Sequence, residues 1–390
     1  MKQMNRNLIL LYIIKISQWF MLYMPVVKLF YEENNLDNFD LLLLHSIYSG
    51  IIFLAEVPSG YLSDVWGRKK TILTGLFLGT IGFVLYSIGT GFWPFLIAEI
   101  ALGIGAGFTS GTDSALLYDT LAVSKRQQKY IWFEGFVSGT GNLAEALAGI
   151  MVTIIALNPV RGYYYLQTLI TVCGFIAAFF LIEPKVHAFH ASLNWRGIAD
   201  IVKDTLWHNK ILQRYIILSA IIGFSSISMA WLAQIYLFDT GLPAKYFGIT
   251  WAALNGIAAI GSMISHKADL LLGKNLALVY ILFFLSAGFF VAAGFIAPAG
   301  IIFLLIFYFV RGTAHPILKE RIQHQTPSQI RATVLSVRSL LIRILFAILG
   351  PFLGAISEKL SLSAALITSG LVVLVPGTLI VFRIIRKKSA

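Results

Sequence analysis

Long apolar stretches recur along nearly the whole chain, and they decide what it can fold into. A helix needs about 20 apolar residues to cross the roughly 30 Å of hydrocarbon in a bilayer. Lipid offers the backbone no hydrogen bonds, so a spanning segment must be a helix or part of a closed barrel. The strands of a barrel are shorter and alternate in polarity, unlike these stretches. We therefore predict an all-α integral membrane protein.

The composition agrees with a chain solvated by lipid. Charged residues make up 12% of it and hydrophobic residues 58%, whereas a soluble domain has about 25% charged residues. Almost no length remains for a soluble domain, which argues against a receptor or enzyme with a large head outside the membrane. The pattern predicts twelve transmembrane helices, over residues 7–30, 40–63, 70–90, 93–121, 130–157, 161–183, 211–238, 245–267, 275–297, 299–322, 331–356 and 361–385.

The basic residues predict the orientation of these spans. If both termini lie in the cytoplasm, most of the 30 Lys and Arg residues fall in cytoplasmic segments. The outer loops then hold only Lys28, Arg161, Lys245 and Lys359. This bias follows the positive-inside rule. The net charge of +12 is thereby explained by topology, and we expect no nucleic-acid partner.

The first helix is expected to stay in the mature protein, because the apolar stretch after Met1–Asn7 is too long for the core of a signal peptide. The single Cys173 excludes an intramolecular disulfide and a cysteine metal cluster. No cofactor and no metal are expected. We expect a lipid-embedded monomer in a bacterial cytoplasmic (inner) membrane, with both termini cytoplasmic.

The chain divides near its middle into two halves of six spans each. We predict a first six-helix bundle over residues 1–183, a cytoplasmic linker over 184–210 and a second bundle over 211–390. Within the linker Trp195, Ile198, Val202 and Leu206 recur at helical spacing, which predicts an amphipathic helix at the membrane surface. A weak repeat, Gly111-Thr112 and Gly312-Thr313, supports duplicated halves.

The loop between the second and third spans has a distinctive composition. It runs Gly60-Tyr-Leu-Ser-Asp64-Val-Trp-Gly67-Arg68-Lys-Lys70. The glycines allow a close approach and a tight turn, Asp64 places an anion at a helix end, and the basic run anchors the loop in the cytoplasm. An aspartate there could make and break an ion pair as two bundles move.

This loop resembles the signature Gly-x-x-x-Asp-x-x-Gly-Arg of the major facilitator superfamily, and all of its fixed positions are present. The resemblance implies two six-helix bundles that open alternately to either side, with Gly60, Asp64, Gly67 and Arg68 as a conformational latch. In the second half Ser265 stands where the acid should be, so the latch is expected to be asymmetric.

Ionisable residues inside the spans are candidate functional groups, because each costs about 2.5–3.5 kcal/mol at the bilayer centre. The first half mainly contributes acids and the second half cations. They are Lys15, Glu56, Glu99, Asp113, Glu134 and Glu145 in the first half, and Arg311, His315, Arg338 and Arg343 in the second. In the fifth span Glu134, Ser138, Gly141 and Glu145 fall on one helical stripe, which we expect to face a cavity.

Two interpretations of these charges stay open. Asp113, Glu134 or Glu145 could bind and release a proton, or Asp113 or Glu134 could pair with Arg311 or Arg338. Glu56 is expected to be a local partner of the signature loop or of Lys15. For His315 we expect a role at the helix end.

The predicted function is secondary active transport of a small organic solute by alternating access, coupled to protons and directed outward. An uncoupled facilitator or importer of the same fold is the alternative; a polytopic membrane enzyme lacks support, because no catalytic motif is present. Two features depart from the proton-coupled drug exporters of the superfamily. Glu99 replaces the arginine that they carry four residues before Gly103, and Gly139-Thr140-Gly141 lacks their proline.

Overall fold

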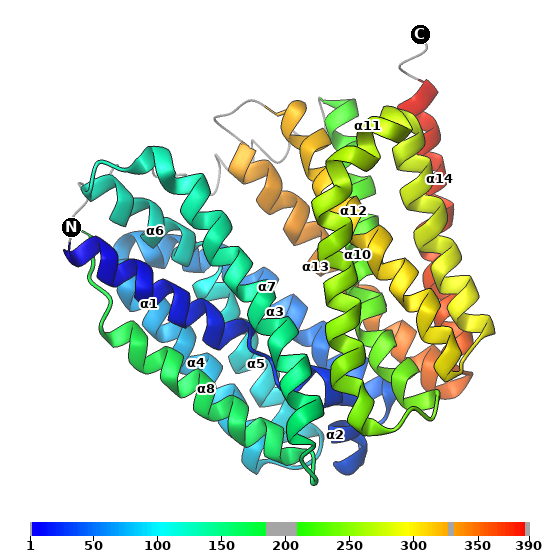
Figure 1. Ribbon diagram of the computed structural model, residues 1–390, viewed down its shortest axis with the longest axis horizontal. Coiled ribbons are helices and arrows are strands. Elements are labelled where there is room, and N and C mark those ends of the chain that lie inside the picture. Colours follow the sequence, from blue (N-terminus) through cyan, green and yellow to red (C-terminus); the bar gives the residue numbers. More distant parts are fainter. Residues whose placement is uncertain (1, 185–208, 327–330, 387–390) are drawn as a thin grey trace. The chain divides into compact units, whose positions relative to one another are not determined.

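The computed structural model describes residues 2–184, 209–326 and 331–386, and these are helical nearly throughout, with no strand among them (Figure 1). The all-α prediction is thereby confirmed. The amphipathic helix predicted around Trp195, Ile198, Val202 and Leu206 lies outside the described residues.

Close contacts divide the chain into two compact units. The first unit comprises Met1–His190 and Pro243–Ala252, and the second comprises Ala191–Leu242 and Ala253–Ala390. The helices before residue 185 are α1 (Lys2–Trp19), α2 (Val27–Glu33), α3 (Asn38–Trp66), α4 (Arg68–Ile88), α5 (Phe92–Thr109), α6 (Thr112–Val123), α7 (Tyr130–Ile155) and α8 (Arg161–Phe179). The later helices are α10 (Lys210–Asp239), α11 (Phe247–Gly294), α12 (Ile301–His324), α13 (Arg331–Lys359) and α14 (Leu362–Arg386).

The part of the chain that the structure describes contains 10 helical stretches long and apolar enough to cross a membrane. One of them holds two spans: α11 has 48 residues, or about 70 Å at 1.5 Å per residue, and its backbone turns at Gly273, where φ is +72°. The helix α7 is long enough but carries polar residues in its first half, and its shorter apolar stretch is Leu143–Ile155, which includes Glu145. Counting both, the helices agree with twelve spans.

Two spans predicted as continuous helices are broken. The chain leaves helical geometry between α1 and α2, around Pro25, which has no N–H to donate. Within this break Leu22 N donates a 3.0 Å hydrogen bond to Gln167 Oε1. The fourth span is interrupted at Ser110 and Gly111, between α5 and α6. The predicted spans over 7–30 and 93–121 correspond to the candidate spans Arg6–Glu33 and Phe92–Val123. The breaks inside them were not predicted, because hydropathy does not register a local change of backbone geometry.

Small residues bring α4 and α5 into close contact. A Cβ added to Gly105 would lie 2.5 Å from Gly75 O and 3.0 Å from Gly79 N, both backbone atoms of α4. Close backbone approach of this kind is a common basis of helix association in membranes, where no hydrophobic effect drives helices together. Gly105 thus lets α5 pack directly against the backbone of α4.

The C-terminal end of α4 is capped by an arginine that also contacts an aromatic ring. Arg161 Nη1 donates to the carbonyl oxygens of Tyr86, Ser87 and Gly89, at 3.2, 3.0 and 2.7 Å. The first two carbonyls belong to the last turn of α4 and the third to its C-cap, where carbonyl groups have no partner within the helix. The Arg161 guanidinium also lies 5.2 Å from the ring centroid of Phe30. One side chain therefore caps α4 and joins it to α2 and α8.

We expect Gly105→Ala to destabilise the protein by about 1–3 kcal/mol, because the new methyl group overlaps backbone atoms that cannot move aside. Gly79→Ala is the matched control, since a Cβ there meets nothing within 4 Å. Thermal unfolding in detergent measures both. Equal melting temperatures for the two variants would contradict the close packing of α4 on α5.

Candidate functional site

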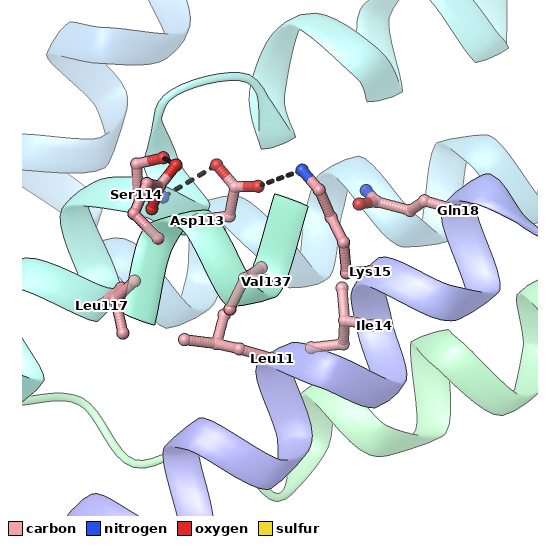
Figure 2. Close-up of a pocket in the computed structure, with 9 residues that line it drawn as sticks. Leu11, Ile14, Lys15, Gln18, Asp113, Ser114, Leu117 and Val137 are labelled. Atoms are coloured by element: carbon pink, nitrogen blue, oxygen red, sulfur yellow. Dashed lines mark hydrogen bonds and ion pairs between the residues drawn. The ribbon is translucent and has the colours of Figure 1, made fainter. Parts of the chain in front are cut away.

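A lysine and an aspartate form an ion pair between two helices of the first unit (Figure 2). Lys15 lies on α1, and its Nζ is 3.1 Å from Asp113 Oδ2. Asp113 stands in the first turn of α6, where the helix dipole favours a negative charge. Its other oxygen accepts a 2.8 Å hydrogen bond from Ser114 N. The two side chains are 19% and 18% exposed, so the pair is shielded by protein.

Ser114 links this pair to a second carboxylate. Its hydroxyl donates a 2.7 Å hydrogen bond to Glu134 Oε1 on α7. We call Lys15, Asp113, Ser114 and Glu134 the polar cluster. It holds one cation and two carboxyl groups, so it is electrically neutral only when one carboxyl group carries a proton. The surrounding pocket is lined by Leu11, Ile14, Lys15, Gln18, Asp113, Ser114, Leu117, Glu134 and Val137.

The acidic stripe of α7 contacts other helices of the first unit. Gly141 lies against Trp19 of α1, since a Cβ added to it would be 3.2 Å from the indole ring. Lys15 Nζ lies 5.8 Å from the centroid of the same ring. Glu134 is joined to α6 through Ser114. Glu145 lies close enough to Tyr23 to interact with it electrostatically.

Glu99 lies in a different network, which the sequence did not reveal. It is 3% exposed, accepts a 2.5 Å hydrogen bond from Tyr86 Oη and is 3.1 Å from His45 Nδ1. Tyr86 Oη is in turn 2.8 Å from Tyr31 Oη. This acid is therefore satisfied by an aromatic and histidine environment and does not join the polar cluster.

Glu56 has a different partner from those expected. Its Oε1 accepts a 3.3 Å hydrogen bond from Ser110 Oγ, at the break between α5 and α6. Of the two expected alternatives, Lys15 pairs with Asp113 instead, and a partnership with the signature loop stays a prediction. Its second oxygen is buried without a hydrogen bond among the described residues.

Arg68 of the signature loop makes contacts on both sides of the turn. Its Nη1 donates a 2.7 Å hydrogen bond to Ser63 Oγ, and its Nε lies 3.3 Å from Asp119 Oδ2 near the end of α6. Gly67 adopts φ +96°, a conformation that side chains disfavour, which agrees with the expected tight turn. Asp119 was not identified from the sequence, because nothing in its local pattern marks it as a partner.

The start of α4 is capped by an acid from the end of the same unit. Glu183 accepts hydrogen bonds of 2.7 Å from both Arg68 N and Lys69 N. These are free N–H groups of the first helical turn. A Cβ at Gly60 would meet nothing within 4 Å, so no close approach occurs there. The side chain of Asp64 lies outside the described residues.

The second unit has an ion pair at the corresponding turn. Gly273 adopts φ +72°, as Gly67 does in the first unit, and Asp269 lies four residues before it. Asp269 pairs with Arg321 near the end of α12. In the first unit the arginine of the pair, Arg68, follows the turn, and its acid lies near the end of the fourth span. In the second unit the acid, Asp269, precedes the turn, and its arginine lies near the end of the tenth span. Ser265 therefore does not mark the loss of an ion pair.

The spanning cations of the second unit are not paired with acids among the described residues of that unit. Arg338 donates to Ser219 Oγ, and its Nη2 is 3.2 Å from His315 Nδ1. Arg311 lies over the ring of Tyr308, 4.7 Å from its centroid. His315 thus contacts a neighbouring helix, whereas a role only at its own helix end was expected.

We expect Lys15→Met and Asp113→Asn each to destabilise the protein by about 1–3 kcal/mol, because each leaves a shielded charge without its partner. The double variant should lose less than the sum of the two. Melting temperatures measure this coupling, and Lys359→Met, at an exposed helix end, serves as the control. Additive effects would show that the ion pair contributes nothing.

Asp119→Asn and Asp269→Asn should lower the melting temperature by similar amounts, since each removes the acid from an ion pair beside a positive-φ glycine. If only Asp269→Asn leaves the melting temperature unchanged, the ion pair of the second unit does not stabilise the protein, and the asymmetric latch expected from the sequence is supported.

Comparisons with known proteins agree with the fold. Solved structures with closely similar folds include the nucleoside transporter NupG, with a TM-score of 0.78, 13% identity and coverage of 99% of both chains. A D-xylose-proton symporter superposes with a TM-score of 0.73 at 12% identity, covering 96% of this chain and 95% of that one. At such identities the likeness concerns the fold alone.

Sequence relatives cover smaller parts of the chain. MdtL, a multidrug resistance protein of Escherichia coli O81 (strain ED1a), is 24% identical over 260 residues, or 65% of this chain and 64% of its own. NorA, a quinolone resistance protein of Staphylococcus aureus, is 22% identical over 185 residues, or 47% of each. A probable chloroplastic anion transporter of Arabidopsis thaliana is 30% identical over 135 residues, or 34% of this chain and 25% of its own. The chain thus spans between a quarter and two thirds of these relatives.

The family assignment comes from a match over most of the length. Residues 8–351 match the Major Facilitator Superfamily, and this range includes the signature loop, the polar cluster and the ion pair of the second unit. The protein is therefore a multi-pass membrane protein with the fold of a transporter, and the chain belongs to the major facilitator superfamily.

Proposed function

We propose that this protein is a proton-coupled secondary transporter that moves a small organic solute out of the cell, with both termini in the cytoplasm. Two six-helix bundles, residues 1–183 and 211–390, would open alternately to either side, joined by the linker over 184–210. It would work as a monomer in the cytoplasmic membrane of a bacterium. The signature loop around Gly60, Asp64, Gly67 and Arg68 would act as the conformational latch.

The observation that carries the proposal is the polar cluster, with one ammonium group and two carboxyl groups held within a mainly apolar pocket. A charge in this setting is costly unless it is offset. Lys15 and Asp113 offset each other at 3.1 Å. Glu134 is held by a hydroxyl group from Ser114, which cannot offset its charge.

Glu134 is therefore the group whose protonation removes the remaining charge of the cluster. Tyr130 lies beside both Ser114 and Glu134 and interacts with them. Its hydroxyl group therefore belongs to the same hydrogen-bond network as Glu134. A proton that binds to Glu134 neutralises its charge. Ser114 connects Glu134 to Asp113, because its hydroxyl group donates to Glu134 and its backbone N–H donates to Asp113 Oδ1 at 2.8 Å. The Lys15–Asp113 pair then sets the position of Ser114, and Glu134 binds the proton.

The names of the sequence relatives favour outward transport, because an inward proton gradient alone drives import by symport as well as export by antiport. Protons that enter the cell release free energy, which an antiporter uses to expel a solute. The sequence relatives MdtL and NorA are named for multidrug and quinolone resistance, which fits export. The alternative is an importer or uncoupled facilitator, since structures of the same fold include a nucleoside transporter and a xylose-proton symporter.

We expect purified protein in liposomes to couple the flow of protons to the movement of a solute. The probes are a fluorescent quinolone, a nucleoside and xylose, each under an imposed pH gradient, with a pH-sensitive dye inside the vesicles. Glu134→Gln should abolish the dependence of solute movement on the gradient, because its side chain cannot exchange a proton. Asp113→Asn should weaken it, because Ser114 loses its fixed position.

Glu320→Gln is the matched control, because Glu320 is an acid near the end of α12, beside His324 and outside the polar cluster. It should keep wild-type coupling. If both Glu134→Gln and Asp113→Asn still concentrate a probe against its gradient, the proton coupling is wrong and an uncoupled or differently coupled carrier remains. If none of the three probes moves in either direction, quinolones, nucleosides and xylose are excluded as solutes.

A further inference from the structure

The membrane-spanning part of the second unit carries cations without acids. Among the described residues of this unit the acids are Asp239, Asp269, Glu320 and Glu358, and all lie near helix ends. Asp269 is paired with Arg321, and Glu320 contacts His324. The cations in the spans therefore have no carboxylate beside them among the described residues of their own unit.

Three of these groups converge from two helices. Arg311 and His315 are four residues apart on α12 and share one face. Arg338 of α13 reaches the same histidine, with Nη2 3.2 Å from Nδ1. The charged groups that act on His315 are Arg338, Arg311 and Lys319, all of them cations. Lys319 is exposed, one turn further along the same helix.

The hydrogen bond between Arg338 and His315 fixes the state of the histidine. Arginine only donates, so His315 Nδ1 must accept, and the ring is neutral. Ser219 of α10, itself fully buried, accepts from Arg338 Nε. Neither contact offsets the charge of Arg338, because both partners are neutral.

Arg311 is satisfied even less. Its guanidinium rests on the Tyr308 ring, and its Nη1 is buried without a hydrogen bond among the described residues. A buried donor without an acceptor is expensive, more so when it carries charge. Arg343 also has a buried unpaired Nε, but it lies five residues after Arg338, about 140° around the helix, and it is not part of this group.

We infer that Arg311, His315 and Arg338 form a binding site for an anionic group, a carboxylate or phosphate, on the transported solute. An oxyanion supplies the acceptor that Arg311 Nη1 lacks and the negative charge that offsets both arginines. The planar guanidinium fork matches the geometry of carboxylate and phosphate. The site narrows the solute of the proposed function to organic anions, and it rests on that function.

Equilibrium binding tests the site without any transport. Full-length protein in a neutral detergent is unfolded by heat at constant ionic strength, in the presence of benzoate, phenyl phosphate, benzylammonium, benzyl alcohol or phosphatidylglycerol. Benzoate or phenyl phosphate should raise the melting temperature saturably, and the midpoint concentration should rise about tenfold or more in Arg311→Gln and Arg338→Gln, since each loses a charged hydrogen bond. The two soluble arms tell carboxylate from phosphate.

Arg214→Gln is the control, because Arg214 lies near the start of α10, where it donates to the carbonyl oxygen of Arg383, and is not one of the three groups of the site. It should leave the midpoint unchanged. Arg311→Gln should not lower the melting temperature of the ligand-free protein, because it removes a buried donor that has no acceptor, so a loss of binding in this variant reports the site and not misfolding.

Several results would overturn the inference. They are stabilisation by benzylammonium or benzyl alcohol alone, by phosphatidylglycerol alone, by none of the probes, or by anions equally in wild type and both arginine variants. These outcomes leave proton coupling untouched, since it is measured in liposomes through Glu134. Conversely, a failure of coupling leaves anion binding measurable.

Discussion

Backbone hydrogen bonding in a medium without water is the constraint on which the rest of this structure depends. It enforces helices, and it also dictates what must happen where a helix is interrupted. At the break after α1, Gln167 accepts from Leu22 N. At the two ends of α4, which lie in loops, Arg161 donates to three carbonyl oxygens and Glu183 accepts from two N–H groups, as free groups at helix ends require. These three polar side chains therefore form hydrogen bonds with backbone groups at helix ends.

The breaks that cost hydrogen bonds also position the candidate site. Asp113 lies in the first turn of α6 because the fourth span is interrupted at Ser110 and Gly111. A continuous helix would bury its N–H groups in intrahelical bonds and turn this aspartate away from a helix start. The interruption instead gives it the favourable end of a helix dipole and a position 3.1 Å from Lys15. The same break gives Glu56 its partner Ser110.

The sequence predicted the helices well and their side-chain partners poorly, for a physical reason. Span number, the turn at Gly67 and the family follow from hydropathy, backbone preference and a local motif, each of which is written in consecutive residues. The pairing of Arg68 with Asp119, or of Glu99 with His45 and Tyr86, joins residues that are far apart along the chain. Which acid meets which cation depends on helix rotation and packing, and small residues such as Gly105 allow several rotations that hydropathy does not distinguish.

The two units treat their charges differently, and this difference separates the roles that we assign to them. In the first unit Asp113, Glu134 and Glu99 contact a cation, a hydroxyl group and a histidine, respectively. The binding of one proton is therefore enough to change the net charge of such a group. Among the described residues of the second unit, Arg311 and Arg338 contact Tyr308, Ser219 and a neutral His315. A proton cannot relieve this excess of positive charge, because arginine does not release one in proteins. Only an anion can offset it, which is why the proton is assigned to Glu134 and the solute to the arginines.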